Sequence, residues 1–177
     1  CIRDRLFSYF RNILCLTDTV MFNSYSTTIM KKQPLISVIV ASYNYAKYIK
    51  ETLDSLIRQT NKSFEVIVVD DGSRDQSLPI IEEYANRFKN IKLYTHPGNQ
   101  NRGLAETVKL GIEKSNGEYI AFCESDDYWT NNHVEYLQDT IQQNPLANFI
   151  VNGIKVINLS NNPEYDSYIE FSSSFLK

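Results

Sequence analysis

The sequence has few cysteines, no long apolar segment and no excess of basic residues, and each of these absences argues against a class of protein. The three cysteines, Cys1, Cys15 and Cys123, are odd in number and are spaced neither as a disulfide framework nor as a zinc site. A net charge of -3 and a pI near 5.4 argue against nucleic-acid binding. No apolar stretch approaches the length of a transmembrane helix. The cysteine usage favours a reducing, cytoplasmic compartment.

The first 29 residues differ in character from the rest of the 177. They mix arginine with apolar residues and have no clean hydrophobic region or small-residue cleavage site, which argues against a signal peptide. At Met30 the segment MKKQPLISVIV is typical of a natural start just before a first strand. We therefore interpret residues 1–29 as an extension outside the folded domain, and whether it is native stays open. An amphipathic surface helix over residues 2–16 is the alternative.

From residue 35 onward, short apolar runs alternate with segments of helical periodicity. The first four runs are four to six residues long and include β-branched residues, which favours buried strands over helices, and a longer fifth run is interrupted near Gly153. Between them, apolar residues recur three and four positions apart, as on one face of a helix. We expect strands over 35–40, 64–69, 91–94, 119–123 and 148–157, and helices over 49–57, 80–88, 104–112 and 134–141.

Such an alternation predicts an α/β fold of the Rossmann-like class. Short links between strand and helix favour parallel βαβ units, so the sheet should be mostly parallel with helices on both faces. With 42% hydrophobic residues the chain can build a core of ordinary size. We expect one nucleotide-binding domain over residues 30–160. The polar tail 161–177 would begin an incomplete acceptor-binding part, so that the fold is truncated at its carboxyl terminus.

Polar and acidic residues follow three of the expected strands. Right-handed crossovers bring the carboxyl ends of these strands to one edge of the sheet, where open α/β sheets bind ligands. We expect five carboxylates to gather there and to need a cation, with Mg²⁺ or Mn²⁺ bound to a phosphate as the natural choice. The three strand ends read ASYN at 41–44, DDGS at 70–73 and ESDD at 124–127.

Each of these segments also has an interpretation without a ligand. Asp and Ser after a strand often serve only as turn or cap residues, and Gly72 could merely supply a positive φ. Tyr43 alone is more often a packing aromatic. The segment 124–127 is harder to account for in this way, because a cap needs one acidic residue and the sequence supplies three. His96 and His133 are isolated, and we expect structural roles for both.

Taken in order, three segments of the chain resemble the family 2 glycosyltransferases, whose catalytic domain has the GT-A fold. The resemblance covers residues 34–157 and includes a strand ending in Ser-Tyr-Asn, a Ser-Leu-x-x-Gln-Thr helix end and a strand ending in Asp-Asp-Gly-Ser. The segments are SVIVASYNYAKYIKETLDSLIRQT (37–60), FEVIVVDDGSRDQS (64–77) and GEYIAFCESDD (117–127).

The resemblance implies a nucleotide-sugar site with a divalent metal, Mg²⁺ or Mn²⁺. Tyr43 would stack on or edge the nucleobase, Asp71 would accept a hydrogen bond from the base, and a UDP-sugar is favoured. Glu124 would lie at the ribose or at a metal-bound water. The implied nucleotide-binding residues are Ala41, Ser42, Tyr43, Asn44, Asp71, Gly72, Glu124 and Ser125, and the implied metal ligands are Asp126 and Asp127.

The implied reaction is metal-dependent, inverting transfer of the sugar to an acceptor hydroxyl in surface polysaccharide or glycolipid synthesis. Glu124 stands where the family more often has Asp, and Thr107-Val108-Lys109 replaces an Ala-Arg-Asn triplet. No residue matches the family's general base, which we expect beyond Lys177.

Two other functions stay open: a nucleotide-sugar-binding fragment without catalytic competence and, less well supported, a sugar nucleotidyltransferase. The acceptor would be a saccharide or a lipid-linked saccharide. The expected location is the cytoplasm, with peripheral association at the inner face of the membrane left open.

Overall fold

The computed structural model describes residues 36–147, 149–150, 154–155 and 168–169. The expected extension over 1–29, the residues around Met30 and most of the tail 161–177 therefore lie outside the described residues. Within the described residues, no helix is both long and apolar enough to cross a membrane.

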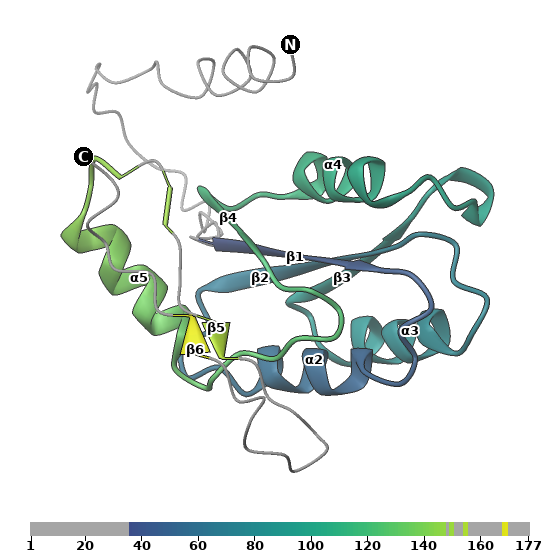
Figure 1. Ribbon diagram of the computed structural model, residues 1–177, viewed down its shortest axis with the longest axis horizontal. Helices are drawn as coiled ribbons and strands as arrows, with labels where there is room; N and C mark the ends of the chain where they lie inside the picture. Colours follow the sequence, from purple (N-terminus) through teal and green to yellow (C-terminus); the bar gives the residue numbers. More distant parts are fainter. Residues whose placement is uncertain (1–35, 148, 151–153, 156–167, 170–177) are drawn as a thin grey trace, which may run out of the picture. The chain divides into compact units, whose positions relative to one another are not determined.

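The centre of the fold is a sheet of four parallel strands in the order β3-β2-β1-β4 (Figure 1). All seven residues of β2 are buried, as expected for a central strand covered on both faces. The parallel sheet predicted from the apolar runs is confirmed, and each strand begins and ends within two residues of the expected position. The strands are β1 (Ile36–Ser42), β2 (Phe64–Asp70), β3 (Ile91–Thr95) and β4 (Tyr119–Phe122).

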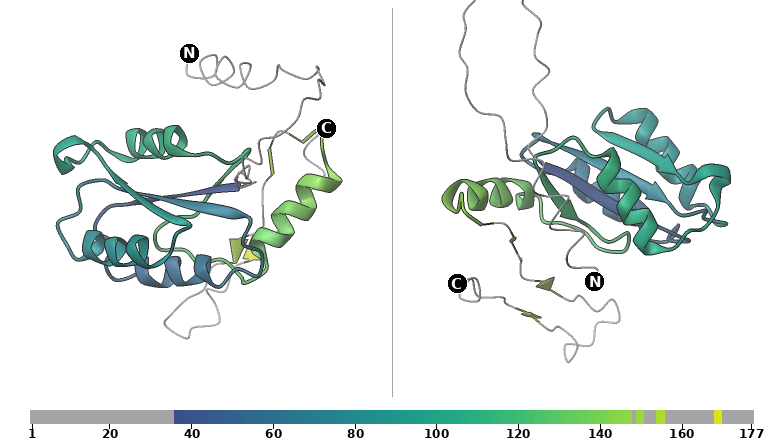
Figure 2. Two further views of the ribbon diagram at one scale, coloured as in Figure 1. Left: turned by 180° about the vertical axis from the view of Figure 1, so that it is seen from behind. Right: turned by 90° about the horizontal axis from the view of Figure 1, so that it is seen from above.

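Helices cover both faces of this sheet, as the alternating pattern predicted (Figures 1 and 2). α2 and α3 pack on the face that carries Val38, Val40, Val66 and Val68, and α5 adds two buried residues to the same core. α4 lies on the other face, where a Cβ on Gly111 would stand 2.7 Å from the side chain of Ile39. The helices are α2 (Ile49–Ile57), α3 (Ser77–Arg87), α4 (Leu104–Lys114) and α5 (His133–Gln143), with a 3₁₀ turn η1 (Pro97–Asn99).

The amino-terminal end of the sheet is closed by a buried carboxylate. Glu65 is 5% exposed. Its Oε1 accepts hydrogen bonds from the Ser37 hydroxyl at 2.7 Å and the Asn116 backbone N–H at 2.6 Å, and its Oε2 accepts one from Lys92 Nζ at 2.6 Å. Burial would raise the pKa of Glu65, but these bonds, that from Lys92 first, lower it below its ordinary value. One carboxylate thus ties three neighbouring segments together.

The fifth strand expected over 148–157 is described only in part. Within it the structure has β5 (Ile154–Lys155), which pairs antiparallel with β6 (Tyr168–Ile169). β6 falls in the tail that the sequence pattern left without an element, because two residues are too few for any periodicity to show.

Candidate functional site

The loops after β1 and β2 hold each other at the carboxyl-terminal edge of the sheet. The Asn44 backbone N–H donates to Ser73 Oγ at 2.9 Å, and Asn44 Oδ1 accepts the Arg74 backbone N–H at 2.8 Å. Asn44 has a φ of 58°, a conformation that asparagine tolerates better than most residues. The side chain of Asn44 therefore joins the two loops, a role in addition to the nucleotide contact expected for it.

The same two loops are also joined through Asp75 and Ser77. Asp75 Oδ2 accepts the Ala46 backbone N–H at 3.0 Å, and Ser77 Oγ accepts the Tyr45 backbone N–H at 2.8 Å. Burial would raise the pKa of Asp75, but hydrogen bonds from Ser77 and Ala46 lower it. These bonds hold the loop after β1 against the loop after β2, and Tyr43, the first residue after β1, is 41% exposed.

A third loop reaches this edge because residue 72 is glycine. Gly72 has a φ of +74°, and a Cβ there would lie 2.7 Å from the backbone oxygen of Asn99 and 2.8 Å from the backbone nitrogen of Asn101. Only a residue without a side chain allows two backbones to approach so closely. Gly72 is therefore needed for the loop after β3 to pack against the end of β2.

Asp71 is the residue on which that third loop closes. Its two carboxylate oxygens accept the backbone N–H groups of Arg102, at 2.6 Å, and Gly103, at 2.9 Å. His96 Nε2 lies 3.6 Å from Oδ1 of the same carboxylate and 3.1 Å from Thr107 Oγ1. Asp71 is 4% exposed and His96 7%. A carboxylate held by two N–H groups stays available as an acceptor, since each oxygen can accept a second bond.

Asp70 points away from Asp71 and belongs to the core side of the sheet. It pairs in register with Ser42, and by strand alternation both side chains share the face of Val40 and Val68. Asp70 Oδ2 accepts the Ser73 backbone N–H at 2.9 Å. Among the described residues, Ser42 Oγ and Asp70 Oδ1 are the buried side-chain atoms without a hydrogen-bond partner. Two buried polar atoms therefore lie at the carboxyl ends of β1 and β2.

The expectation that five carboxylates gather at this edge is wrong for Asp70. Asp70 is fully buried on the α2–α3 face, because successive residues of a strand point to opposite sides. Asp71 is already compensated by backbone donors. The exposed negative charge of this edge therefore comes from the segment after β4.

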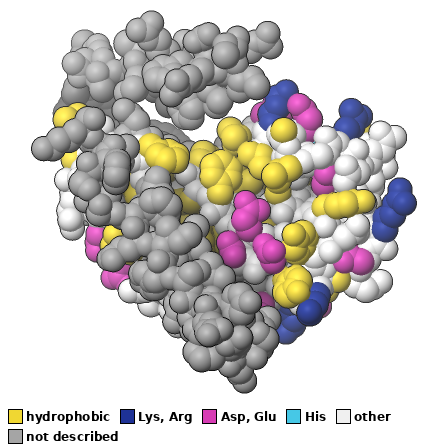
Figure 3. All heavy atoms as spheres, in the orientation of Figure 1, with side chains coloured by type: hydrophobic (Ala, Val, Ile, Leu, Met, Phe, Trp, Pro, Cys, Tyr) yellow, Lys and Arg dark blue, Asp and Glu magenta, His cyan; other side chains and the backbone are white. Residues whose placement is uncertain are grey.

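That segment, residues 124–127, is here called the acidic loop. Glu124, Asp126 and Asp127 are exposed, and acidic side chains gather over this loop in the space-filling view (Figure 3). Ser125 between them is 3% exposed, and its backbone carbonyl accepts a hydrogen bond from Thr52 Oγ1 at 3.0 Å. Partial burial and the charge of Asp126 raise the pKa of Asp127. Burial, reinforced by the three carboxylates, raises the pKa of the neighbouring Cys123 thiol far above its usual range.

The donor set of the acidic loop fits a cation held partly by protein and partly by substrate. Among the residues that the structure describes, no three His, Cys, Asp or Glu side chains are grouped so that they could hold a metal ion by themselves. Mg²⁺ and Mn²⁺ commonly take one or two carboxylates and complete their coordination with water and phosphate oxygens. Burial first, and then the charge of Asp126, raise the pKa of Asp127, and a cation bound at the two aspartates would offset both effects.

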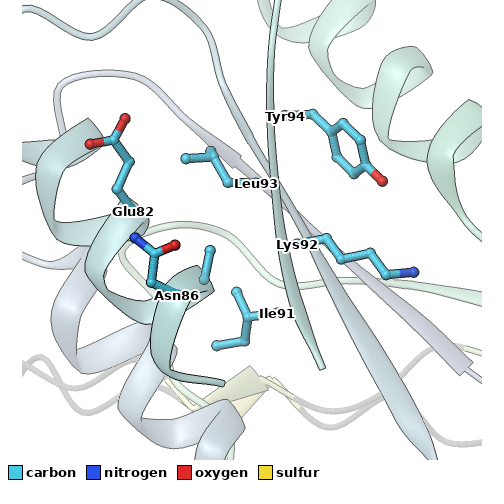
Figure 4. Close-up of a pocket in the computed structure, with 7 residues that line it drawn as sticks. Glu82, Asn86, Ile91, Lys92, Leu93 and Tyr94 are labelled. Carbon is cyan, nitrogen blue, oxygen red and sulfur yellow. The ribbon is translucent and has the colours of Figure 1, made fainter. Parts of the chain in front are cut away.

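A cavity elsewhere in the fold does not belong to this edge. It measures about 460 Å³ and is a shallow depression between α3 and the edge strand β3 (Figure 4). Its one ammonium group, that of Lys92, is already bonded to Glu65. The cavity is lined by Glu82, Ala85, Asn86, Ile91, Lys92, Leu93 and Tyr94, none of which comes from the loops described above.

Three buried polar residues that bear on the acidic loop could not be assigned a role from periodicity alone. Thr52, Ser55 and Gln59 are each 1% exposed, and each is hydrogen-bonded to the segment 125–134. Ser55 and Gln59 belong to the Ser-Leu-x-x-Gln-Thr signature, which by itself indicates no contact for either. A polar residue at a helix position that should be buried is the signal that could have singled them out.

Comparison with known proteins agrees with this arrangement. The sequence profile described as Glycosyl transferase family 2 matches residues 37–174. The chain belongs to glycosyltransferase family 2. A glycosyltransferase of Haemophilus influenzae is 38% identical over 114 residues, which is 64% of this chain and 45% of that protein.

Two solved structures share the fold. Staphylococcus aureus TarS (residues 1–349) in complex with UDP-GlcNAc is 36% identical, with a TM-score of 0.58 over 62% of this chain and 32% of that one. The mannosyltransferase PcManGT of Pyrobaculum calidifontis, in complex with GDP-Man and Mn²⁺, is 23% identical, with a TM-score of 0.55 over 86% of this chain and 42% of that one. The second likeness concerns the fold alone. The matched part of this chain thus spans less than half the length of each of these three proteins.

Proposed function

We propose that this chain carries the donor site of a glycosyltransferase that moves a sugar from a nucleotide-sugar to an acceptor hydroxyl. The observation that carries the proposal is that Asp71, bound by two backbone N–H groups, and the exposed acidic loop both follow strands of one parallel sheet, at the same edge. The 36% identity to TarS, a structure with UDP-GlcNAc, supports the same assignment and favours UDP as the nucleotide.

In this proposal the loops after β1 and β2 receive the nucleoside. Tyr43, which is 41% exposed, stacks on the base, and Asp71 accepts a hydrogen bond from the ring N–H. Ala41, Ser42 and Asn44 contribute through the shape of their loop, and Gly72 through the close approach of the loop after β3. Among nucleobases, a carboxylate acceptor favours those with a ring N–H, such as uracil and guanine.

The acidic loop receives the diphosphate. Asp126 and Asp127 are the carboxylates that would hold Mg²⁺ or Mn²⁺, with Glu124 at the ribose or at a bound water and Ser125 as the buried support between them. A divalent cation bound there offsets the negative charge that develops on the leaving diphosphate. PcManGT, whose structure contains Mn²⁺, offers a precedent within the fold.

The reaction exchanges one bond at the anomeric carbon for another. The acceptor oxygen forms a bond to that carbon, the bond to the diphosphate oxygen breaks, and a general base takes the hydroxyl proton. Inversion at the anomeric carbon follows from a single displacement. The acceptor would be a saccharide or lipid-linked saccharide of the cell envelope. Transfer would take place in the cytoplasm or at the inner face of the membrane. A chain that binds the donor without transferring the sugar is the alternative.

Calorimetric titration of the full 177-residue chain with UDP, with and without MnCl₂, tests the donor site. We expect Mn²⁺ to strengthen UDP binding and Asp126→Asn to abolish that gain. Asp139→Asn is the matched control, because it removes one exposed carboxylate from α5, outside the acidic loop. No binding of UDP, GDP or TDP to the folded chain would refute the proposal. Sugar transfer, measured separately, distinguishes an enzyme from a binding fragment.

A further inference from the structure

Three polar side chains of α2 and the turn after it are buried and directed at one distant segment. Thr52 and Ser55 are three residues apart on one side of α2, and Gln59 follows four residues later, in the turn after the helix, where its amide also donates to the Ser55 carbonyl. Buried polar groups need hydrogen-bond partners. Their partners across the fold lie in residues 125–134, which are 71 to 75 positions further along the chain. α2 and the turn after it are therefore hydrogen-bonded to the acidic loop and to the residues that follow the loop.

Two of these side chains hydrogen-bond to the backbone on either side of Asp126 and Asp127. Thr52 Oγ1 donates to the Ser125 carbonyl at 3.0 Å, and Ser55 Oγ accepts the Trp129 backbone N–H at 3.1 Å. The Ser55 hydroxyl in turn donates to the Thr52 carbonyl at 2.7 Å, so the two anchors support each other. The aspartates at 126 and 127 lie between these fixed points.

Gln59 uses both ends of its amide to hold the chain beyond the loop. Its Nε2 donates to the Thr130 carbonyl at 2.7 Å and to the Ser55 carbonyl at 3.1 Å, and its Oε1 accepts the Val134 backbone N–H at 2.9 Å. Val134 lies in the first turn of α5, where backbone N–H groups have no partner within the helix. Only an uncharged amide offers two donors and an acceptor together in this shape.

We propose that Gln59, with Thr52 and Ser55, is a positioning residue that holds Asp126 and Asp127 in the geometry that binds a divalent cation and a diphosphate. The proposal rests on the proposed function. It adds that the binding strength of the acidic loop is set from α2, by residues that touch neither the metal nor the nucleotide.

The physical reason is the repulsion between the two aspartates. Asp126 and Asp127 are adjacent and exposed, and like charges repel, so a free loop would move the two carboxylates apart. Hydrogen bonds on both sides of the pair prevent this movement before any ligand arrives. When the coordinating side chains are already held in place, binding does not carry the entropic cost of ordering them, so the affinity is higher.

The test compares two buried glutamines. Gln59→Met keeps the length of the side chain and removes its hydrogen bonds to the segment after the acidic loop. Gln138→Met is the matched control, since Gln138 is 9% exposed and its amide bonds to Ser63 and Asn61 instead. Ser55→Ala removes one anchor with a smaller change in packing. Each variant is titrated with Mn²⁺, UDP and uridine where circular dichroism shows it to be folded, and hydrogen exchange of residues 124–134 is followed by mass spectrometry.

We expect Gln59→Met to weaken the Mn²⁺-dependent part of UDP binding by about tenfold or more, as outer supports of metal sites commonly do, with uridine affinity unchanged. Exchange within 124–134 should become faster. Ser55→Ala should act in the same direction and Gln138→Met should leave binding unchanged.

If Gln59→Met and Ser55→Ala bind Mn²⁺ and UDP like the unaltered chain, the positioning role is refuted while the donor site stands. If the unaltered chain fails to bind them, both proposals fall.

Discussion

Replacing Glu65 by glutamine tests whether a buried charge holds the amino-terminal end of the sheet. The carboxylate is 5% exposed and accepts hydrogen bonds from the Ser37 hydroxyl, the Asn116 backbone N–H and Lys92 Nζ. Glutamine keeps the shape and one oxygen for Ser37 and Asn116. It removes the charge that strengthens those bonds and turns an N–H₂ group toward the ammonium of Lys92.

The size of the effect follows from the partners. A hydrogen bond to a charged group contributes about 1.5–3 kcal/mol and a neutral one about 1 kcal/mol, so weakening two bonds costs about 2 kcal/mol. The side chain of Lys92 is 40% exposed, and its ion pair with Glu65 adds no more than about 1 kcal/mol. We therefore expect the free energy of unfolding to fall by about 2–3 kcal/mol in urea titrations near neutral pH.

The pH dependence provides the decisive check. The pKa of Glu65 is lower in the folded chain than its ordinary value of 4.5, so its charge stabilises the fold fully above that value. This contribution is lost as the pH falls through the lowered folded pKa. The difference in free energy of unfolding between the unaltered chain and Glu65→Gln should be constant from about pH 7 down to about pH 5, and it should shrink as the pH falls below 4.5. Lys92→Met serves as the control, with a smaller loss. A Glu65→Gln chain as stable as the unaltered one at neutral pH would refute the reasoning.

Three further outcomes follow from single contacts. Gly72→Ala should destabilise the fold by about 3 kcal/mol or more and Gly98→Ala by about 1–2 kcal/mol in urea titrations. Both have positive φ, but only at Gly72 would a Cβ strike neighbouring backbone. Tyr84→Phe should lower the free energy of unfolding by about 1.5 kcal/mol, because the Tyr84 hydroxyl donates to the carboxylate of Asp54 at 2.6 Å; the low end of the range for a charged acceptor applies, since the Asp54 side chain is 36% exposed. Cys123 should resist thiol reagents in the folded chain, since its thiol is buried with a raised pKa. Folded Cys123→Ser and unaltered chains should therefore show equal labelling, and in urea the variant should show one site fewer.

The parallel sheet could be predicted from the sequence because its strands are buried on both faces. Five of the seven residues in each of β1 and β2 are apolar, and a short β-branched run bounded by polar residues favours a buried strand over a helix. The helices between them were predictable for the same reason, since each presents an apolar side to the sheet. The β5–β6 pair was not, because elements of two residues carry no pattern.

The edge of the sheet could be located from the sequence, but its internal contacts could not. Parallel strands must bring their carboxyl ends together, so residues 70–73 and 124–127 are expected at one edge. The anchoring of Asp71 by the backbone of residues 102–103 depends on a loop at least 31 positions away, whose conformation no local pattern encodes. The partners of Gln59 across the fold are 71 and 75 positions distant, and a buried amide shows its purpose only when they are known.

The two adjacent aspartates at the end of β2 show how one short motif can serve two purposes. Strand alternation directs the Asp70 side chain to the face covered by α2 and α3, where it accepts a hydrogen bond from the Ser73 backbone N–H. Ser42, its partner in register on β1, points to the same face. Asp71, one position later, accepts the backbone of the loop that leads into α4. Asp70 therefore fixes the loop after β2, and Asp71 fixes the loop that leads into α4. These hydrogen bonds hold the loops in place without a ligand, so the two aspartates can follow a buried strand without disrupting the end of the sheet.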